Sequence, residues 1–408
     1  MKRAKPGIII KKTFKYFIFG LLSAALVYLI SDYINSAEIP LKPDRVFNLS
    51  CTKAKDLVVQ ELDYDGNLWA TRGLLIYKLD KESERFKRIA RVPTGFSLMW
   101  LNNFTCVRHL LLRHECVELV ISKKGDICAY AAGHVRYKKN DEKKFKKSLK
   151  LPNYGIGIGR GIMNAGILSS NDSLIFLGEY FRNEEKNNVV IYRSCNYGMN
   201  WDSAHVFKPG VVRHIHAVQR DPYSNHIWVC AGDEDHESRI GWSDDQLNTI
   251  NIIGSGSQVW RVCQLVFTEN SVLWGTDSGN SVELSGIYYW DKASNKLKKI
   301  FNIDGAIFYG TRLSDGTIIF SLEREGIASE IDNITKLYLL DATGEITTIN
   351  CGTWKYNKPG IRFAPARLRI QRNQGSKFLA VTCLNLQEID NSDLIIIQED
   401  ILMSKNSK

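Results

Sequence analysis

The densest run of polar side chains lies between residues 211 and 245 and reads VVRHIHAVQRDPYSNHIWVCAGDEDHESRIGWSDD. His214 and His216 alternate with Ile215, so both imidazoles project from one face of a strand. After the turn RDPYSNH, the next strand ends in GDEDHES, which contains Asp233. Two imidazoles near carboxylates can transfer protons, and such groups could also hold a divalent metal. We predict His214, His216 and Asp233 as catalytic residues, with no metal and no other cofactor. Alternatively, the histidines hydrogen-bond a neighbouring segment and the acidic run is an exposed turn.

Arginines recur at nearly constant intervals between residues 160 and 362. The five are separated by 53, 48, 51 and 50 residues: Arg160, Arg213, Arg261, Arg312 and Arg362. If they converge, their guanidinium groups form a ring suited to bidentate binding of carboxylate, sulfate or phosphate. Tyr309, in FYGTR, is a further predicted catalytic residue. The alternative is that arginine is simply common here and that the strands present these residues in different phases.

Strand-like segments repeat along the chain at a regular interval. Short β-branched and aromatic runs follow turn residues, as in DGNLWAT, NHIWVCAG and DGTIIFSL. A second strand follows each run, at intervals of 58, 57, 49, 47, 50 and 57 residues: LIYKL, HVRY, IYRS, IGWS, IYYW, LYLL and LIII. About fifty residues is typical of one four-stranded propeller blade. We therefore predict an all-β chain with a β-propeller of seven four-stranded blades over residues 46–402, with six or eight blades as alternatives.

Two short segments within this repeat share a further motif. In RSCNYGMNW, Ser194, Gly198 and Trp201 fit the repeat Ser-x-Asp-x-Gly-x-Thr-Trp. In SDDQLNTI, 49 residues further on, the matching residues are Ser243, Asp245 and Thr249. On these residues the chain resembles the Asp-box, or bacterial neuraminidase repeat, superfamily of β-propellers. The motif is expected to shape the turn between the third and fourth strands of a blade.

That superfamily includes sialidases and many other secreted glycan-active proteins. Its sialidases use three arginines, a Tyr–Glu pair and an Asp, and begin with a Tyr/Phe-Arg-Ile-Pro strand that FKRIARVP at 86–93 does not match. A histidine pair on an inner strand is similar to propeller-type polysaccharide lyases, in which a histidine abstracts the proton next to a uronate carboxylate. We expect a propeller that binds an acidic glycan. Cleavage as a glycosidase or lyase is one interpretation, and a non-catalytic scaffold or binding module for surface-polysaccharide assembly is the other.

The N-terminus is predicted to anchor the propeller in a membrane. Residues 1–15 carry six basic and no acidic residues, which favours a cytoplasmic tail. About 18 largely apolar residues follow, so residues 16–34 are predicted as a single-pass signal-anchor helix, with a cleaved signal peptide as the alternative. Residues 35–45 are expected to form a linker and 403–408 a short tail. The propeller would then face the periplasm or the exterior.

The distribution of charge argues against nucleic acid as a partner, and the cysteine spacing argues against a zinc site. The net charge of +10 comes from the N-terminal tail and from the loop 136–150, each of which contributes +6. The rest of the chain is close to neutral, so we predict no nucleic-acid partner. The nine cysteines include CVRHLLLRHEC at 106–116, whose spacing is poor for zinc and better suits a disulfide loop or two buried thiols.

Overall fold

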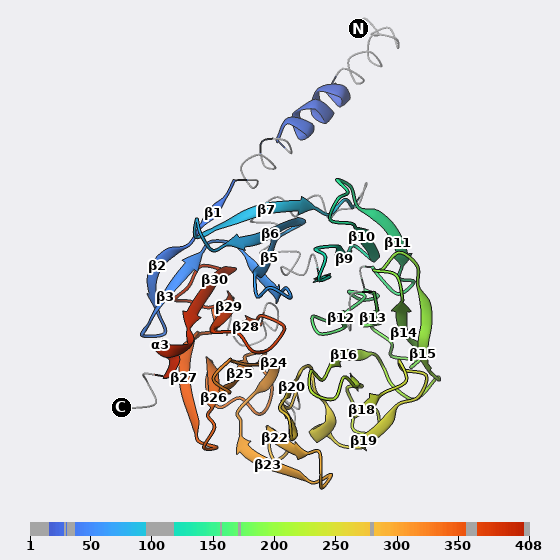
Figure 1. Ribbon diagram of the computed structural model, residues 1–408, viewed down its shortest axis with the longest axis vertical. Coiled ribbons are helices and arrows are strands. Elements are labelled where there is room, and N and C mark those ends of the chain that lie inside the picture. Colours follow the sequence, from blue (N-terminus) through green and yellow to red (C-terminus); the bar gives the residue numbers. More distant parts are fainter. Residues whose placement is uncertain are drawn as a thin grey trace, which may run out of the picture.

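The computed structural model describes residues 16–27, 30, 37–94, 118–155, 157–169, 173–277, 281–355 and 365–403. Within these ranges the chain forms seven antiparallel sheets that stand around a common centre like the blades of a ring (Figure 1). First strands of neighbouring blades contact each other at this centre, as β12 (Ile167–Ser169) does with β8 (Glu118–Ile121) and β16 (Ile215–Arg220). The fold is an all-β, seven-bladed propeller, as the repeat interval predicts.

Blades are numbered here in chain order of their first, innermost strands. Blade 1 contains β4 (Val58–Leu62), β5 (Leu68–Arg72), β6 (Leu75–Asp80), β7 (Arg85–Arg91) and, at its outer edge, β1 (Ile39–Pro40). Blade 2 contains β8, β9 (Ile127–Ala131), β10 (His134–Lys138) and β11 (Lys146–Lys150). Blade 3 contains β12, β13 (Ile175–Gly178), β14 (Val189–Ser194) and β15 (Asp202–Phe207). Blade 4 contains β16, β17 (Ile227–Ala231), β18 (Arg239–Ser243) and β19 (Asn251–Ser255).

The remaining blades follow the same order. Blade 5 contains β20 (Leu265–Phe267), β21 (Ser271–Gly275), β22 (Gly286–Asp291) and β23 (Leu297–Asn302), and a 3-10 turn, η2 (Gln258–Trp260), precedes it. Blade 6 contains β24 (Ala306–Arg312), β25 (Ile318–Glu323), β26 (Ile334–Leu340) and β27 (Ile346–Thr353). Blade 7 contains β28 (Arg367–Ile370), β29 (Phe378–Leu384), β30 (Asp393–Gln398), β3 (Leu49–Ala54) and β2 (Lys42–Val46), and α3 (Glu399–Met403) follows β30.

Burial changes from the second to the fourth strand of a blade. In blade 4, every residue of β17 (IWVCA) is buried, whereas β19 (NIIGS) has no buried residue. Second strands are covered on both faces by the neighbouring blades, so they are largely apolar. The seven sequence segments that set the repeat interval prove to be the third strands, from β6 to β30, because these combine an apolar pattern with a turn on each side.

The ring is closed by strands from both ends of the chain. In blade 7, β3 pairs antiparallel with β30, with Thr52 opposite Ile396 and Ala54 opposite Leu394. Residues 35–45 were expected to form a linker, but β1 and most of β2 lie there and extend the outer edges of blades 1 and 7. The sheets therefore begin at Ile39, since the outer edges of two blades provide backbone partners for this segment.

The two Asp-box-like segments lie where the motif predicts, between the third and fourth strands of blades 3 and 4. Ser194 Oγ accepts a hydrogen bond from the backbone N–H of Gly198 at 2.8 Å and donates to Asn196 Oδ1 at 3.1 Å. Ser243 Oγ accepts from the backbone N–H of Leu247 at 2.9 Å and donates to Asp245 at 2.8 Å. Asn196 thus provides the same acceptor oxygen as the usual Asp.

The structure describes only part of the predicted N-terminal helix and of the cysteines. Residues 16–27 and 30 are helical and stand apart from the ring (Figure 1), while 28–29 and 31–34 lie outside the described residues. No helix among the described residues is both long enough and apolar enough to cross a bilayer. The basic loop 136–150 forms the hairpin of β10 and β11 at the blade edge. Cys106 and Cys116 lie outside the described residues, and the seven described cysteines are free thiols.

Candidate functional site

The predicted catalytic residues gather at one end of the central channel. His214 directly precedes β16, His216 is the second residue of that strand, and Asp233 follows the end of β17. This face is formed by the starts of first strands and the ends of second strands, so neighbouring blades contribute side chains to it at equivalent positions. The strand hairpin of blade 4 alone brings the two histidines and the carboxylate together.

Three side-chain atoms of this group meet at nearly equal distances. Nε2 of His214 lies 3.0 Å from Nε2 of His216, and Asp233 Oδ1 lies 3.2 Å and 3.1 Å from these two nitrogens. Both imidazoles are buried, whereas the side chain of Asp233 is 17% exposed. We refer to these three residues as the His–His–Asp group. The structure thus brings together three of the residues that the sequence predicts as catalytic.

Backbone oxygens fix the two imidazole rings from behind. Nδ1 of His214 lies 3.1 Å from the carbonyl oxygen of Phe181, and Nδ1 of His216 lies 3.2 Å from that of Val262. A carbonyl oxygen can only accept, so each Nδ1 carries a proton and each Nε2 is directed at Asp233. The histidines do bond to neighbouring blades, as the alternative interpretation expected, but only through one nitrogen each.

Electrostatics within the group favour an ionised carboxylate. Burial acts to raise the pKa of Asp233, but the hydrogen bonds to His214 and His216 hold it well below its usual value. Burial lowers the pKa of His216, against the raising effect of Asp233. Tyr180 lies against His214 with ring centroids 4.0 Å apart, and burial raises the pKa of its phenol.

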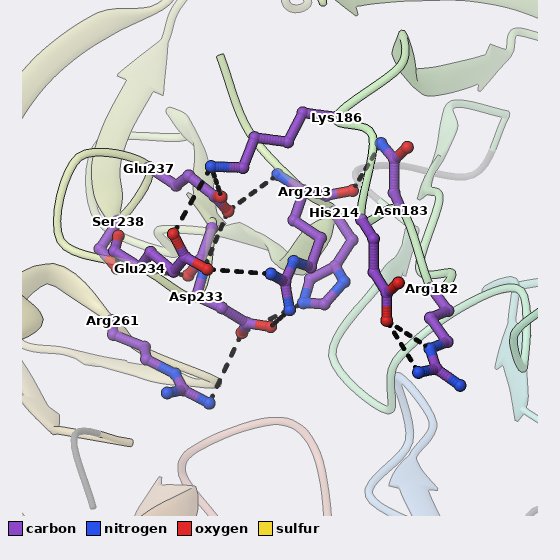
Figure 2. Close-up of polar contacts among 12 residues, drawn as sticks. Arg182, Asn183, Lys186, Arg213, His214, Asp233, Glu234, Glu237, Ser238 and Arg261 are labelled. Carbon is purple, nitrogen blue, oxygen red and sulfur yellow. Dashed lines mark hydrogen bonds and ion pairs between the residues drawn. The ribbon is translucent and has the colours of Figure 1, made fainter. Parts of the chain in front are cut away.

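Two of the five predicted arginines reach this group from opposite sides (Figure 2). Arg213 Nη1 lies 3.6 Å from Asp233 Oδ2, and Arg261 Nη2 lies 3.5 Å from Oδ1. Each has a second carboxylate: Arg213 donates to Glu234 at 3.1 Å, and Arg261 Nε lies 3.2 Å from Asp277. The mouth therefore carries mixed charge, which differs from the purely cationic ring that the spacing suggested.

A depression of about 640 Å³ lies in front of these arginines. Its walls include Arg213, Asp233, Arg261 and Gln258, and neither His214 nor His216 is among its lining residues. The histidines thus lie beneath Asp233, and a ligand in the depression would meet the carboxylate and the arginines first.

The other predicted residues are distributed along the channel, and Arg160 lies near Tyr180 at this same end. Arg312 ends β24 on the opposite face, where its Nη1 donates to Tyr223 at 2.5 Å, so it does not join the ring of arginines. Its phase along the strand, late rather than early, places it at the wrong end. Arg160 precedes β12, and its charge acts on Tyr180 and on Tyr309. Tyr309 is buried on β24 beside Phe308, and burial raises its pKa to about 12. Arg362 lies outside the described residues.

Sequence reasoning missed several groups at the same mouth. Burial raises the pKa of the Asp277 carboxyl to about 7, against the effect of Arg261, and Cys263 Sγ lies 3.6 Å from its Oδ2. Glu237 is fully buried and accepts from the backbone N–H groups of Arg213 at 3.1 Å and Asp233 at 3.3 Å. One signal could have found part of this set: in blades 3 to 6 the second residue after the second strand is Tyr180, Asp233, Asp277 or Glu325.

The far end of the channel contains a separate cavity of about 410 Å³. It is lined by residues at the ends of first strands, including Leu62, Ile121 and Phe267. Between the two ends, Arg369 of blade 7 forms two hydrogen bonds to Glu118 of blade 2, at 3.0 Å and 2.9 Å. Both side chains are buried, so an ion pair rather than solvent occupies this part of the channel.

Comparisons with known proteins agree with the fold. No family model and no curated protein matches the chain. An oligogalacturonate lyase in complex with manganese is similar in structure, with TM-score 0.53, 11% identity, and coverage of 90% of this chain and 99% of that chain. YCF48 from Cyanidioschyzon merolae gives TM-score 0.50, 13% identity, and coverage of 89% and 99%. The fold is shared. At such identities the likeness shows the propeller alone.

Proposed function

We propose that this protein binds an acidic saccharide in the depression at the channel mouth and cleaves it there. The observation that carries this proposal is the convergence of Arg213 and Arg261, from segments before the first strands of blades 4 and 5, on one depression. Each guanidinium side chain is 26% exposed, so each retains surface for a ligand. Planar guanidinium groups match the carboxylate or sulfate of an acidic sugar.

The mixed charge of the mouth suits a polyhydroxyl ligand that also carries acid groups. An incoming carboxylate takes a place beside the arginines, while Asp235 and the amide of Gln258 are available to sugar hydroxyls at the rim. Gln258 Nε2 is held at 2.9 Å from Asp235 Oδ1, so this part of the rim is ordered before a ligand arrives. Such preorganisation lowers the entropic cost of binding.

Two carboxyl groups at the mouth, those of Asp233 and Asp277, have pKa values shifted in opposite directions. Asp233 is ionised, whereas Asp277 keeps its proton to about neutral pH, and the guanidinium group of Arg261 lies between them. Pairs of carboxyl groups whose pKa values differ in this way serve as proton acceptor and donor in glycan cleavage. The oligogalacturonate lyase of similar fold supports a glycan-cleaving assignment without choosing between hydrolysis and elimination.

The test is an activity screen with matched arginine variants. Purified protein is incubated with sialylated, uronate-containing and sulfated glycans, and released reducing ends are measured together with the ultraviolet absorbance of unsaturated uronates. We expect product with one acidic class, and at least a tenfold loss of kcat/KM in Arg261→Ala. Arg312→Ala is the control, because Arg312 lies at the opposite face. Absorbing products would indicate a lyase, and reducing ends without absorbance a hydrolase. A screen without product or binding, or equal loss in both variants, would refute the proposal.

A second candidate is a non-catalytic binding propeller for polysaccharide assembly. The position of His214 and His216 favours it, because neither histidine lines the depression and a ligand there need not meet these two predicted catalytic residues. Thermal stabilisation by an acidic glycan that Arg261→Ala abolishes, with no product at any time, would favour this candidate over the enzyme.

We also propose that residues 16–34 anchor the propeller in a membrane, with the propeller outside the cytoplasm. The basic tail followed by an apolar run supports this arrangement. The full chain should stay in the membrane fraction after alkaline carbonate washing. Added protease should cleave the propeller in cells whose cell envelope is permeabilised outside the cytoplasmic membrane. Release by carbonate would contradict the anchor.

A further inference from the structure

The His–His–Asp group leaves three electron-rich atoms facing one another. Both Nδ1 atoms face carbonyl oxygens of Phe181 and Val262 and therefore carry the ring protons. In neutral rings the two Nε2 atoms then present lone pairs, and Asp233 Oδ1 presents a third, all within 3.0–3.2 Å of one another. Such an arrangement requires a cation among these atoms, which is either a proton or a metal ion.

The spacing of the three atoms matches the ligand set of a metal ion. Ligands at about 2.1 Å from an ion are about 3.0 Å apart at right angles and about 3.4 Å apart in a tetrahedron. The observed separations of 3.0, 3.1 and 3.2 Å lie nearer to the first arrangement. Two imidazoles and one carboxylate on one face of an octahedron are a known ligand set for divalent transition metals.

The surroundings supply what such ligands need. A carbonyl oxygen behind each Nδ1 fixes the ring orientation and the tautomer that a metal requires, which is the usual outer contact of metal-binding histidines. The charge of the nearby Arg213 does not oppose a cation without compensation, because Arg213 is paired with Glu234 at 3.1 Å.

Two other clusters of potential ligands are weaker candidates. The set of His216, Cys263 and Asp277 shares His216 with the His–His–Asp group, and its Asp277 already lies 3.2 Å from Arg261 Nε. Glu234, His236 and Glu237 form a second set, in which Glu234 and His236 are exposed and Glu237 is buried. Lys186 already occupies this set, with Nζ 2.6 Å from His236 Nε2 and from Glu237 Oε1.

We propose that Nε2 of His214, Nε2 of His216 and Oδ1 of Asp233 bind one divalent transition-metal ion, such as Zn²⁺, Fe²⁺, Mn²⁺ or Co²⁺. Two nitrogen ligands disfavour Mg²⁺ and Ca²⁺, which prefer oxygen. This ion would lie beneath the depression, with its remaining positions open to water or ligand. The inference stands on the three ligand atoms and does not depend on the nature of the glycan.

The test is a titration of the full-length, chelator-treated protein with Co²⁺ at pH 8, followed by its visible absorption, and with Zn²⁺ by calorimetry. We expect one equivalent per chain. Asp233→Asn, which keeps the side-chain shape, and His216→Ala should each weaken binding at least tenfold, since even outer partners of a ligand carry that cost. His236→Ala, at an exposed residue of the set that Lys186 occupies, should bind as the wild type does.

Folding is monitored separately so that a misfolded variant cannot imitate the result. Zn²⁺ should raise the Tm of the wild type and of His236→Ala, but not that of folded Asp233→Asn. Two results would overturn the inference: wild-type protein that shows no Co²⁺ absorption at millimolar concentration, or folded Asp233→Asn with unchanged affinity. None of these readouts involves glycan cleavage, so the metal site and the proposed function can fail independently.

Discussion

Single buried carboxyl groups define how this propeller responds to pH. Glu323, at the end of β25, is fully buried. Its Oε1 accepts from Ser321 Oγ at 3.0 Å, while its Oε2 has no hydrogen-bond partner among the described residues. Burial raises its pKa to about 8, against the effect of Arg367. The folded protein thus holds a proton here that the unfolded chain has already released at neutral pH.

Glu323→Gln should remove a pH-dependent loss of stability. In the unfolded chain the carboxyl ionises near the usual glutamate pKa of 4.5, and in the folded protein near 8, so the free energy of unfolding falls as pH rises between these values. The steepest slope is about 1.4 kcal/mol per pH unit. Urea unfolding at pH 5, 6.5 and 8 should show this decline in the wild type and a smaller one in Glu323→Gln. Glu345→Gln, at an exposed position, is the control, and parallel curves for all three proteins would contradict the prediction.

The site was predictable from sequence only within one blade. His214, His216 and Asp233 belong to one hairpin, so strand alternation and a short turn suffice to bring them together. Asp277 and Cys263 come from the next blade, and their approach depends on how blades pack. Arg312 shows that regular spacing in the sequence does not fix the position of a side chain in the channel. It is the last residue of β24, so it lies at the other end of the channel from Arg213 and Arg261.

At the level of elements, the hairpins between the third and fourth strands of blades 3 and 4 depend on one buried serine each. Ser194 and Ser243 are fully buried, and each Oγ accepts from the backbone N–H group four residues later. In blade 3, Trp201 extends the turn toward blade 2, where its Nε1 lies 3.1 Å from Ser148 Oγ. One motif therefore stabilises both its own hairpin and a contact between blades.

Ser194→Ala and Ser243→Ala should each lower the free energy of unfolding by about 1–3 kcal/mol, because a buried N–H group loses its acceptor. Ser203→Ala, on the exposed strand β15, should change it by less than about 0.5 kcal/mol. Thermal or urea unfolding of the three variants measures the difference. Equal stability of all three would show that the turns hold without their serines.

Third strands could be predicted from the sequence more readily than the outer strands of blade 7. Third strands such as β22 (GIYYWD) are apolar and bounded by turns, so they set the repeat and gave the blade number. The outer strand β2 (KPDRV) has no buried residue and lies mostly within the range predicted as a linker. It pairs with the next strand, β3 (LSCTKA), but β3 also pairs with β30 at the far end of the chain, and no local pattern indicates that pairing.

At the scale of the whole molecule, stability depends on the closure of the ring in blade 7. The contact of β3 with β30 is reinforced by Lys53, whose Nζ lies 2.7 Å from Asp44 and 3.6 Å from Asp393. Ala54 is fully buried within the apolar cluster that joins blades 7 and 1. A propeller without this contact would expose the edge of β30 and the faces of its neighbours.

Ala54→Asp should therefore destabilise the whole ring, since it places a carboxylate in a buried, apolar position. Ser50→Asp is the matched control on the same strand, at an exposed position. We expect a Tm many degrees lower and early proteolytic cleavage for Ala54→Asp, and near wild-type behaviour for Ser50→Asp. If both variants melt together with the wild type, the closure contributes little.

The same closure imposes an order on biosynthesis. Ala54 pairs opposite Leu394, which is made 340 residues later. At about 5–20 residues per second, the ribosome needs roughly 20–70 s to supply that partner. During this interval β3 of the nascent chain lacks its partner β30, so blades 1 to 6 cannot yet be closed into a ring. A chain that terminates anywhere before β30 cannot close the ring of blades. Only chains synthesised through β30 can therefore form the complete propeller.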